Sequence, residues 1–475
     1  MRNFSIKLGF VPTRRLAFDK KEAQKYKNLI RDKLLSWKID LVDIDWLNED
    51  GMLYDIKDVE KVYKYFLEKD VDALFTPHCN FGTESAVAKL GKLMNKPLLL
   101  WGPRDDAPLG SSIRSRDTQC GLFATSKILR RFGVPFTYIT NSRIEDSVFE
   151  KGFNNFIRAA SVVKAFRNMR IGMISTRPGE FWSVMFNEGE LLEKFGIEVI
   201  PIALTEMIAL AREHEDKNSE ILKAVTGDIK EKKIDYSSIG EDNLKKIVAL
   251  KLAMKKWIEE ENLSAVAIQC WMALPDEYGI APCFANAMLT DEKIPVVCET
   301  DIHGAITAVM LQAANMNKEP IFFSDLTIRH PENNNSELLW HCGNFPYSLK
   351  AKDSPASIRW HGEAFPGVAH WKLKEGEITV ARFDGDSGKY SFLMGHAHSV
   401  EGPQTSGTYL WVEVNDWPLW EERFIRGPYI HHVAAIYGKF APVLYEACRY
   451  IPELIPDAVE PSEEELKRWL REQIF

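Results

Sequence analysis

Short apolar runs alternate with amphipathic helical segments through the first two thirds of the 475-residue chain. The runs at 39–44, 71–75 and 97–101 are strand-like, and charged segments of helical periodicity separate them. Strands connected through helices of this length pair in parallel, in a sheet that helices cover on both faces. A second series of the same kind begins at residue 169. The alternation therefore predicts an α/β protein with two successive Rossmann-like parallel α/β domains.

Helical periodicity gives way near residue 354 to short strand-like runs that turn-rich segments separate. This pattern predicts an antiparallel β-domain, either a small barrel or a sandwich, followed by terminal helices. Residues 383–390 (FDGDSGKY) predict a hairpin turn within it, because a calcium loop would need a glutamate at its twelfth position. A chain of this length is too long for one core. We therefore expect three domains, at 1–166, 167–350 and 351–475.

The composition argues against several classes of partner. A net charge of −8 gives no basic footprint for nucleic acid. No run approaches the roughly 20 apolar residues that span a bilayer, and the N-terminus has no signal-peptide pattern. The seven cysteines are scattered and odd in number, which favours reduced thiols. We expect a soluble cytoplasmic protein with no nucleic-acid or membrane partner.

Acidic residues follow two apolar runs in the centre of the chain. Glu299 and Asp301 come after the run at 294–298, and Asp325 comes after the run at 320–323. A helical segment lies between the runs, so a strand–helix–strand unit with two adjacent parallel strands is predicted. Such strands lie about 5 Å apart, and open α/β sheets bind ligands at the carboxyl ends of their strands.

The acids can therefore converge on one hard divalent cation such as Mn²⁺ or Mg²⁺. Each acid alone also has a structural interpretation. Thr300 or Asp301 is suited to capping the helix that follows, and Asp325 is suited to opening a turn.

Most of the 11 histidines lie after residue 302, and three of them are candidate ligands. His341 follows Asp325 within one short segment. The His431–His432 pair follows a Gly-Pro turn and precedes an apolar run, where a neutral imidazole can bind a metal. An added imidazole favours Mn²⁺ or a similar transition metal over Mg²⁺. A thiol nucleophile is not favoured, because the cysteines nearby lie in or at the ends of apolar strands.

Five segments resemble the L-fucose isomerase and L-arabinose isomerase family: AIQCWMALPDEYG, VCETDIHGAITAVML, PIFFSDL, LLWHCGNFP and IHHVAAIYG. The resemblance implies two α/β domains followed by a C-terminal antiparallel β-barrel. It also implies an aldose–ketose isomerase that uses Mn²⁺, with Co²⁺ or Mg²⁺ as alternatives. The acid at 325 follows the fucose enzyme, whereas His341 follows the arabinose enzyme, so the chain resembles a divergent member.

The resemblance also implies roles for individual residues. Glu299 and Asp325 would be both metal ligands and the proton-transferring pair, and which of them is the base stays open. His432 would be the third ligand, and His341 a fourth ligand or the partner of one. Family active sites lie between subunits, which implies a homo-oligomer such as a hexamer. The implied sugar-binding residues are Gln269, Trp271, Arg14 and Arg15.

Three functions remain open on the sequence. The first is a metal-dependent sugar isomerase that works through a cis-enediol. The second is a non-catalytic sugar-binding or regulatory protein on the same fold. The third is a metal-dependent epimerase or hydrolase of sugar derivatives; a phosphate substrate would need a basic anchor, for which the clustered candidates are Arg104, Arg114 and Arg116.

Overall fold

The computed structural model describes residues 4–107, 114–167, 169–217, 219–362 and 364–473. The chain divides into two compact units. Ala165–Leu444 and Glu453–Glu463 form the larger unit, and Phe4–Lys164, Tyr445–Pro452 and the residues from Glu464 onward form what we call the N-terminal unit. The predicted boundaries of three domains stay a prediction. No helix in the part of the chain that the structure describes is long and apolar enough to cross a membrane.

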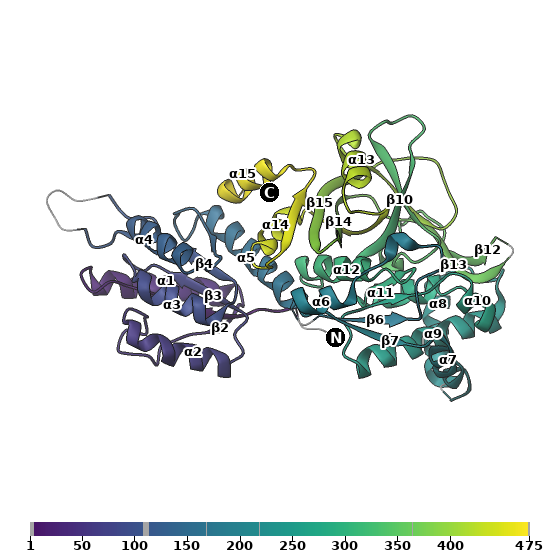
Figure 1. Ribbon diagram of the computed structural model, residues 1–475, viewed down its shortest axis with the longest axis horizontal. Coiled ribbons are helices and arrows are strands. Elements are labelled where there is room, and N and C mark those ends of the chain that lie inside the picture. The colour runs from purple at the N-terminus through teal and green to yellow at the C-terminus, as the bar shows by residue number, and fades with distance from the viewer. Residues whose placement is uncertain (1–3, 108–113, 168, 218, 363, 474–475) are drawn as a thin grey trace. The chain divides into compact units, whose positions relative to one another are not determined.

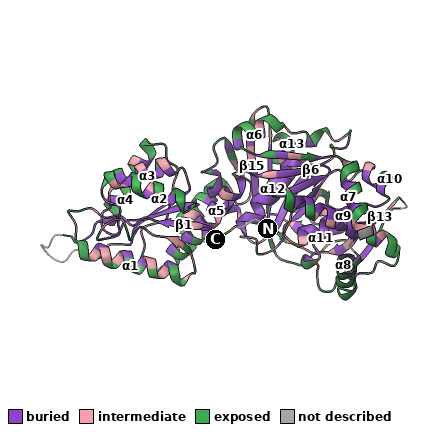
Figure 2. Ribbon diagram, turned by 90° about the horizontal axis from the view of Figure 1, so that it is seen from below, coloured by how far each residue is buried: buried purple, intermediate pink, exposed green. Residues whose placement is uncertain are grey.

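The N-terminal unit is built on a five-stranded parallel sheet in the order β2-β1-β3-β4-β5 (Figure 1). Its central strands are buried along their whole length, as expected where helices cover both faces. Helices α2, α3 and α4 lie on one face and α1 on the other (Figure 2). The elements are β1 (Lys7–Phe10), α1 (Lys20–Ser36), β2 (Asp40–Val42), α2 (Val59–Glu68), β3 (Ala73–Pro77), α3 (Glu84–Met94), β4 (Leu98–Trp101), α4 (Thr118–Arg131), β5 (Thr137–Tyr138), α5 (Ser147–Phe166), α14 (Ala441–Cys448) and α15 (Glu463–Glu472).

The larger unit begins with a four-stranded parallel sheet in the order β7-β6-β8-β9. Together with the first sheet it confirms the prediction of two successive parallel α/β folds. The elements are β6 (Arg170–Ile174), α6 (Glu188–Phe195), β7 (Glu198–Ile202), α7 (Leu204–Lys217), α8 (Ser219–Glu231), α9 (Gly240–Glu260), β8 (Ala265–Ile268), α10 (Ala273–Tyr278), α11 (Cys283–Asp291), β9 (Val296–Cys298) and α12 (Ile302–Ala314).

A closed antiparallel barrel follows, which confirms the predicted fold class. Six strands form the ring in the order β16-β11-β10-β17-β14-β15, and pairing of β15 with β16 closes it. The predicted hairpin at 383–390 is also present: Asp386 pairs with Lys389, and the two residues between them have positive φ, as a two-residue type I′ turn requires. The elements are β10 (Phe322–Arg329), β11 (Ser336–His341), β12 (Ser357–His361), β13 (Phe365–Lys372), β14 (Glu377–Asp386), β15 (Lys389–Ser399), β16 (Thr408–Glu413), α13 (Trp417–Arg426), β17 (His432–Tyr437) and β18 (Leu454–Ala458).

The predicted strand–helix–strand unit around Asp325 is wrong. Strand β9 pairs with β8 in the parallel sheet, whereas β10 pairs antiparallel with β11 and β17 in the barrel. The helix between them, α12, is buried at every residue. It packs against β8 of the parallel sheet and against β14 and β17 of the barrel. A helix that is apolar all round must be covered on all sides, so α12 joins two layers and does not return the chain to the first sheet.

Strand β11 carries a buried acid whose charge is poorly compensated. Glu337 is 3% exposed, and its Oε2 has no hydrogen-bond partner among the described residues. The nearest cation is Arg329, whose Nε lies 3.8 Å from that oxygen. Burial raises the pKa of Glu337 to about 7 from an ordinary value near 4.5, although Arg329 opposes the shift. The folded protein therefore binds a proton more tightly here than the unfolded chain does.

Replacing Glu337 with glutamine is expected to stabilise the protein at pH 8 and not at pH 4. Stability should fall as the pH rises from about 4.5 through 7, because the unfolded chain releases this proton first. We expect a gain of about 1 to 2 kcal/mol at pH 8, after allowance for solvent screening. Thermal unfolding of both proteins at the two pH values measures it. An equal shift at both pH values would contradict the assignment of this pKa.

Candidate active site and metal centre

Four candidate ligands come from four elements of the larger unit. Glu299 follows β9, Asp325 lies within β10, His341 ends β11 and His432 opens β17. Asp325 and His432 are directly opposite each other in the pairing of β10 with β17. The residues therefore come together through the join between parallel sheet and barrel, and not through two parallel strands.

The backbone at Glu299 is strained. Glu299 and Thr300 have φ of 64° and 56°, a left-handed conformation that residues other than glycine seldom adopt. The Thr300 amide donates to Ile268 O at 3.1 Å, and its hydroxyl donates to Thr176 O at 3.2 Å. Strain of this kind costs about 1–3 kcal/mol per residue and gathers at functional sites. It marks the turn after β9 as a candidate site independently of side-chain chemistry.

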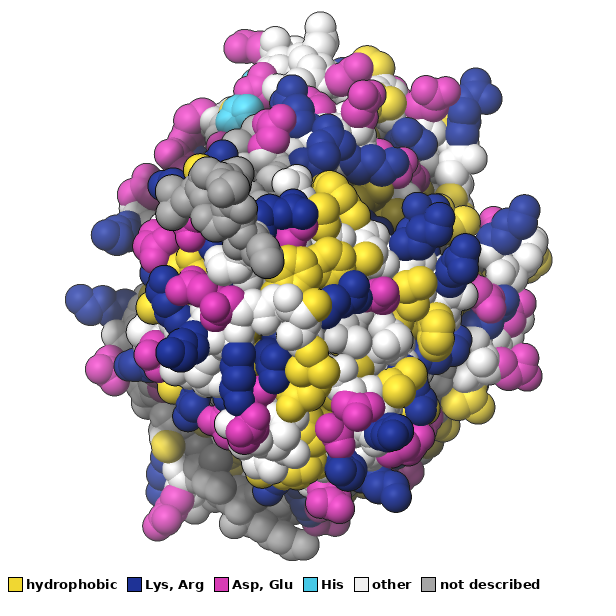
Figure 3. Space-filling view, turned by 90° about the vertical axis from the view of Figure 1, so that its left-hand side faces the viewer, with side chains coloured by type: hydrophobic (Ala, Val, Ile, Leu, Met, Phe, Trp, Pro, Cys, Tyr) yellow, Lys and Arg dark blue, Asp and Glu magenta, His cyan; other side chains and the backbone are white. Residues whose placement is uncertain are grey.

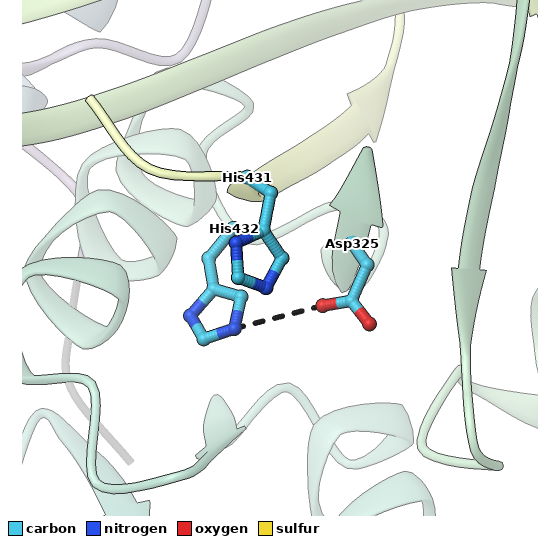
Figure 4. A group of neighbouring side chains, drawn as sticks. All are labelled: Asp325, His431 and His432. Atoms are coloured by element: carbon cyan, nitrogen blue, oxygen red, sulfur yellow. Dashed lines mark ion pairs between the residues drawn. The ribbon is translucent and has the colours of Figure 1, made fainter. Parts of the chain in front are cut away.

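The imidazole of His432 lies between the two predicted catalytic acids. Its Nε2 is 2.8 Å from Glu299 Oε2 and 3.6 Å from Asp325 Oδ1, and the ring is fully buried. Figure 4 shows Asp325, His431 and His432 facing a common space. These three residues offer ligand atoms that all lie within 4.8 Å of one another. The sequence pattern offers both histidines of this pair as candidate ligands, whereas the family resemblance implies a metal-binding role for His432 alone.

Buried polar atoms without partners mark the same place. Glu299 Oε2, Asp325 Oδ1, His341 Nε2 and His432 Nε2 have no hydrogen bond of regular geometry among the described residues, although Glu299 Oε2 and His432 Nε2 form an ion pair at 2.8 Å. A buried polar atom without a partner is costly, and such atoms are rare in folded proteins. Two carboxylate oxygens and the imidazole nitrogen of His432 are a donor set that suits Mn²⁺ or a similar divalent metal. Nδ1 of His341 accepts from the Cys342 amide at 2.9 Å, which places the proton of the neutral ring on Nε2. The residues therefore fit the predicted cofactor.

The electrostatics of the site agree with a cation centre. Burial lowers the pKa of His341, but Asp325, Cys342 and Glu299 together outweigh it and raise the value to about 10. Burial likewise opposes the shift at His432, where the adjacent carboxylates of Asp301 and Glu299 together raise the pKa to about 9. The pKa of Glu299 is lowered: burial would raise it, but His432, His341 and the Trp271 N–H together prevail. The acids thus attract positive charge, and a metal bound here would displace protons from the imidazoles.

The predicted sugar-binding residues of the larger unit adjoin the acids. Trp271 is half exposed, and its Nε1–H donates to Glu299 Oε1 at 3.0 Å. Its ring contacts Phe181, with centroids 5.4 Å apart. The side chain of Gln269 accepts from Ser175 Oγ at 3.4 Å. Trp271 therefore orients the carboxylate of Glu299 and still presents ring surface to solvent.

The two predicted arginines belong to the N-terminal unit. Arg14 is buried, forms an ion pair with Asp50 and stacks on Tyr54. Arg15 pairs with Glu84 and lies over the ring of Phe81. Their predicted contact with a sugar in another subunit stays a prediction.

The candidate phosphate anchor has structural duties of its own. Arg116 is buried over the ring of Tyr26 and donates to the carbonyls of Pro103 and Arg104. Arg114 pairs with Asp117 at 2.8 Å. Arg114 and Arg116 therefore already have partners within the protein.

Asp301 is both the predicted helix cap and a member of the site. Its Oδ1 accepts from the Gly304 amide at 2.9 Å, which confirms the capping interpretation. Its Oδ2 lies 3.0 Å from His432 Nδ1. The capping pattern predicted the first contact, but no local pattern predicts a partner 131 residues away.

The thiols near the acids are unreactive in character. Contact with Cys298, together with burial, raises the pKa of Cys270 well above its usual value. The pKa of Cys298 is also raised: a hydrogen bond with Cys270 lowers it, but burial and neighbouring charges prevail. Thiolates are therefore disfavoured here, in agreement with the expectation that these cysteines are not nucleophiles.

Comparison with known proteins gives consistent matches. A family model described as the N-terminal domain of fucose/sulfoquinovose isomerase matches residues 9–167. Sulfoquinovose isomerases of Priestia aryabhattai and Priestia megaterium are each 26% identical over 452 residues, covering 93% of this chain and 97% of theirs. The sulfoquinovose isomerase of Alkalicoccus urumqiensis is 28% identical over 311 residues, covering 65% of this chain and 68% of its own.

Proposed function

We propose that this chain, a divergent member of the fucose/sulfoquinovose isomerase family, interconverts an aldose and its ketose with the help of a divalent metal, preferably Mn²⁺. The buried carboxylate oxygens of Glu299 and Asp325 that face Nε2 of His432, for which the described residues supply no hydrogen bond of regular geometry, carry this proposal. A non-catalytic sugar-binding protein would have no need for such atoms at one place.

In the proposed reaction the two acids transfer the proton. Moving a carbonyl from C1 to C2 removes a proton from C2 and delivers one to C1 through a cis-enediol, and the proton of the C2 hydroxyl is transferred to the oxygen at C1. Glu299 and Asp325, on either side of His432, are the carboxylates that would take and return it. A bound divalent cation would supply Lewis-acid stabilisation of the negative charge that develops on the two sugar oxygens. Trp271 holds the Glu299 carboxylate through its indole N–H and offers an apolar surface to the sugar.

Sulfoquinovose is the first substrate to test, because the relatives that cover most of the chain carry the name sulfoquinovose isomerase. We propose that the substrate is a hexose or deoxyhexose with a carbonyl at C1 and a hydroxyl at C2. The identity of the group at C6 is a separate question from the isomerisation itself.

A substrate panel tests the proposal. Purified full-length protein with Mn²⁺ should convert sulfoquinovose, L-fucose, L-arabinose or another aldose to its ketose, measured by NMR of the sugar carbons. Exchange of the C1 proton with solvent D₂O is expected during turnover, because a carboxylate releases protons between steps. Chelation should abolish conversion and Mn²⁺ should restore it. If no sugar of the panel is converted and none shows exchange, the proposed reaction is wrong.

We also propose a cytoplasmic homo-oligomer. The N-terminal unit exposes the large apolar side chains Leu16, Phe123 and Tyr138. Figure 3 shows apolar side chains gathered among charged ones on one face. Exposed apolar patches with polar surroundings are typical of protein interfaces, which supports an assembly of several copies.

A further inference from the structure

An array of buried ion pairs continues from His432 away from the two catalytic acids. Asp301 Oδ2 lies 3.0 Å from His432 Nδ1. Arg382 contacts both oxygens of Asp301, through Nη1 on Oδ2 and through Nη2 on Oδ1 at 3.1 Å. Its Nε donates to Asp384 Oδ2 at 2.8 Å, and Asp384 Oδ1 lies 2.8 Å from His303 Nδ1. Each of these five residues is at most 5% exposed.

The array consists of residues from three elements that meet inside the larger unit. Asp301 and His303 stand at the start of α12, Arg382 and Asp384 lie on β14, and His432 opens β17. Salt bridges this deeply buried are weak contributors to stability, because desolvation of the charges offsets their attraction. Stability alone therefore gives little reason to place five ionisable groups here.

We propose that Asp301, held by Arg382, is a positioning residue that fixes the proton of His432 on Nδ1 and so leaves the lone pair of Nε2 toward Glu299 and Asp325. This inference rests on the proposed metal-dependent function. Both Asp301 oxygens already receive donors from Arg382, and Oδ1 also accepts from the Gly304 amide. The carboxylate can therefore present only lone pairs to His432, and a hydrogen bond requires the proton on Nδ1.

The direction of the imidazole is what a metal ligand needs. A histidine that binds a metal through one nitrogen almost always donates its other N–H to a carboxylate or carbonyl, which fixes the ring and raises its basicity. Here Nε2 faces Glu299 Oε2 at 2.8 Å and Asp325 Oδ1 at 3.6 Å. One guanidinium between two carboxylates leaves excess negative charge beside the imidazole, which strengthens Nε2 as a donor to a cation.

Gly304 provides the space for this carboxylate. A Cβ at Gly304 would lie 2.7 Å from Asp301 Oδ2 and 2.6 Å from Phe323 Cε2. Neither atom has room to retreat, because Asp301 and Phe323 are both buried. The glycine that follows the acids in the segment ETDIHG thus permits the close approach of Asp301 to His432.

The experiment compares Asp301→Asn, Arg382→Met and Arg382→Lys in the full-length chain. Asparagine is isosteric with aspartate, but its NH₂ can donate to Nδ1 and move the imidazole proton to Nε2, as happens in a serine protease triad when its aspartate becomes asparagine. We expect Asp301→Asn and Arg382→Met to weaken Mn²⁺ binding about 10- to 100-fold, measured from the free Mn²⁺ signal in electron paramagnetic resonance. Arg382→Lys should recover part of the loss, and Gly304→Ala should reproduce it without a change of charge.

A second readout does not depend on metal. In the metal-free protein, the His432 Nδ1–H should give a solvent-protected, downfield proton resonance, assigned by its disappearance in His432→Gln. It should be lost in Asp301→Asn and broadened in Arg382→Met. Arg116→Met is the control, because Arg116 is similarly buried but belongs to the N-terminal unit, and it should change neither readout.

The outcomes separate this inference from the proposed function. If wild-type protein takes up no Mn²⁺, the proposed function is wrong. The Nδ1–H resonance then still tests whether Asp301 fixes the proton on His432 Nδ1. If the folded Asp301→Asn protein keeps both the resonance and the Mn²⁺ affinity within twofold, the array does not position His432. Equal losses in Arg116→Met would reduce the effect to general destabilisation and overturn the inference.

Discussion

Glu299→Gln is expected to lower kcat/KM at least a thousandfold with little change in folding. Glutamine keeps the length of the side chain and an oxygen that can accept from Trp271 Nε1, now 3.0 Å from Glu299 Oε1. It removes a proton-transferring carboxylate, an effect worth roughly 10²–10⁴ in rate, and it removes one anionic ligand from the proposed metal site. Initial rates on the best aldose of the panel, at saturating Mn²⁺, measure the loss.

Glu337→Gln is the matched control for that experiment. Glu337 is also a buried glutamate of the larger unit, on β11, but its neighbours are Arg329 and Glu421 and none of the site residues. Its replacement should leave kcat/KM unchanged within twofold. A comparable loss in both variants would mean that Glu299 acts through the integrity of the fold and not through chemistry.

The alternation of strands and helices could be predicted because it depends on local periodicity. The position of β10 could not, since the partner of a strand is chosen by tertiary packing. Runs 294–298 and 320–323 look alike in sequence, yet one forms the edge of a parallel sheet and the other belongs to a barrel. The composition of α12 held the missing information: a helix without a polar face must lie between two layers.

The candidate site shows the same division between local and distant information. Resemblance and residue chemistry pointed to Glu299, Asp325, His341 and His432, and the structure brings Glu299 and Asp325 to His432. Arg382 was missed because nothing in the run RFDGD (382–386) distinguishes a buried arginine from an ordinary strand residue beside a hairpin. Of its two partners, Asp301 lies 81 residues away along the chain, and Asp384 lies two residues away.

The two adjacent histidines should differ sharply in their effect on metal binding. His432 is fully buried, and its Nε2 faces both acids, so His432→Gln is expected to weaken Mn²⁺ binding at least a hundredfold. His431 is exposed, although it lies within 4.8 Å of the ligand atoms of Asp325 and His432. The part of its imidazole that is shielded from water, together with the positive charge of His432, lowers the pKa of the ring, which is therefore neutral at pH 7 and able to bind a substrate hydroxyl.

His431→Gln is therefore expected to weaken Mn²⁺ binding by less than tenfold and to raise KM for the sugar. Titration of free Mn²⁺ for both variants, beside wild type and at one pH, separates the alternatives. If both variants lose Mn²⁺ affinity equally, His431 is a ligand. The metal would then be bound by Asp325, His431 and His432, without Glu299. A loss confined to His432 would place His431 outside the metal centre. An exposed imidazole binds a cation only in competition with water, whereas Nε2 of the buried His432 faces both carboxylates, 2.8 Å from Glu299 Oε2 and 3.6 Å from Asp325 Oδ1.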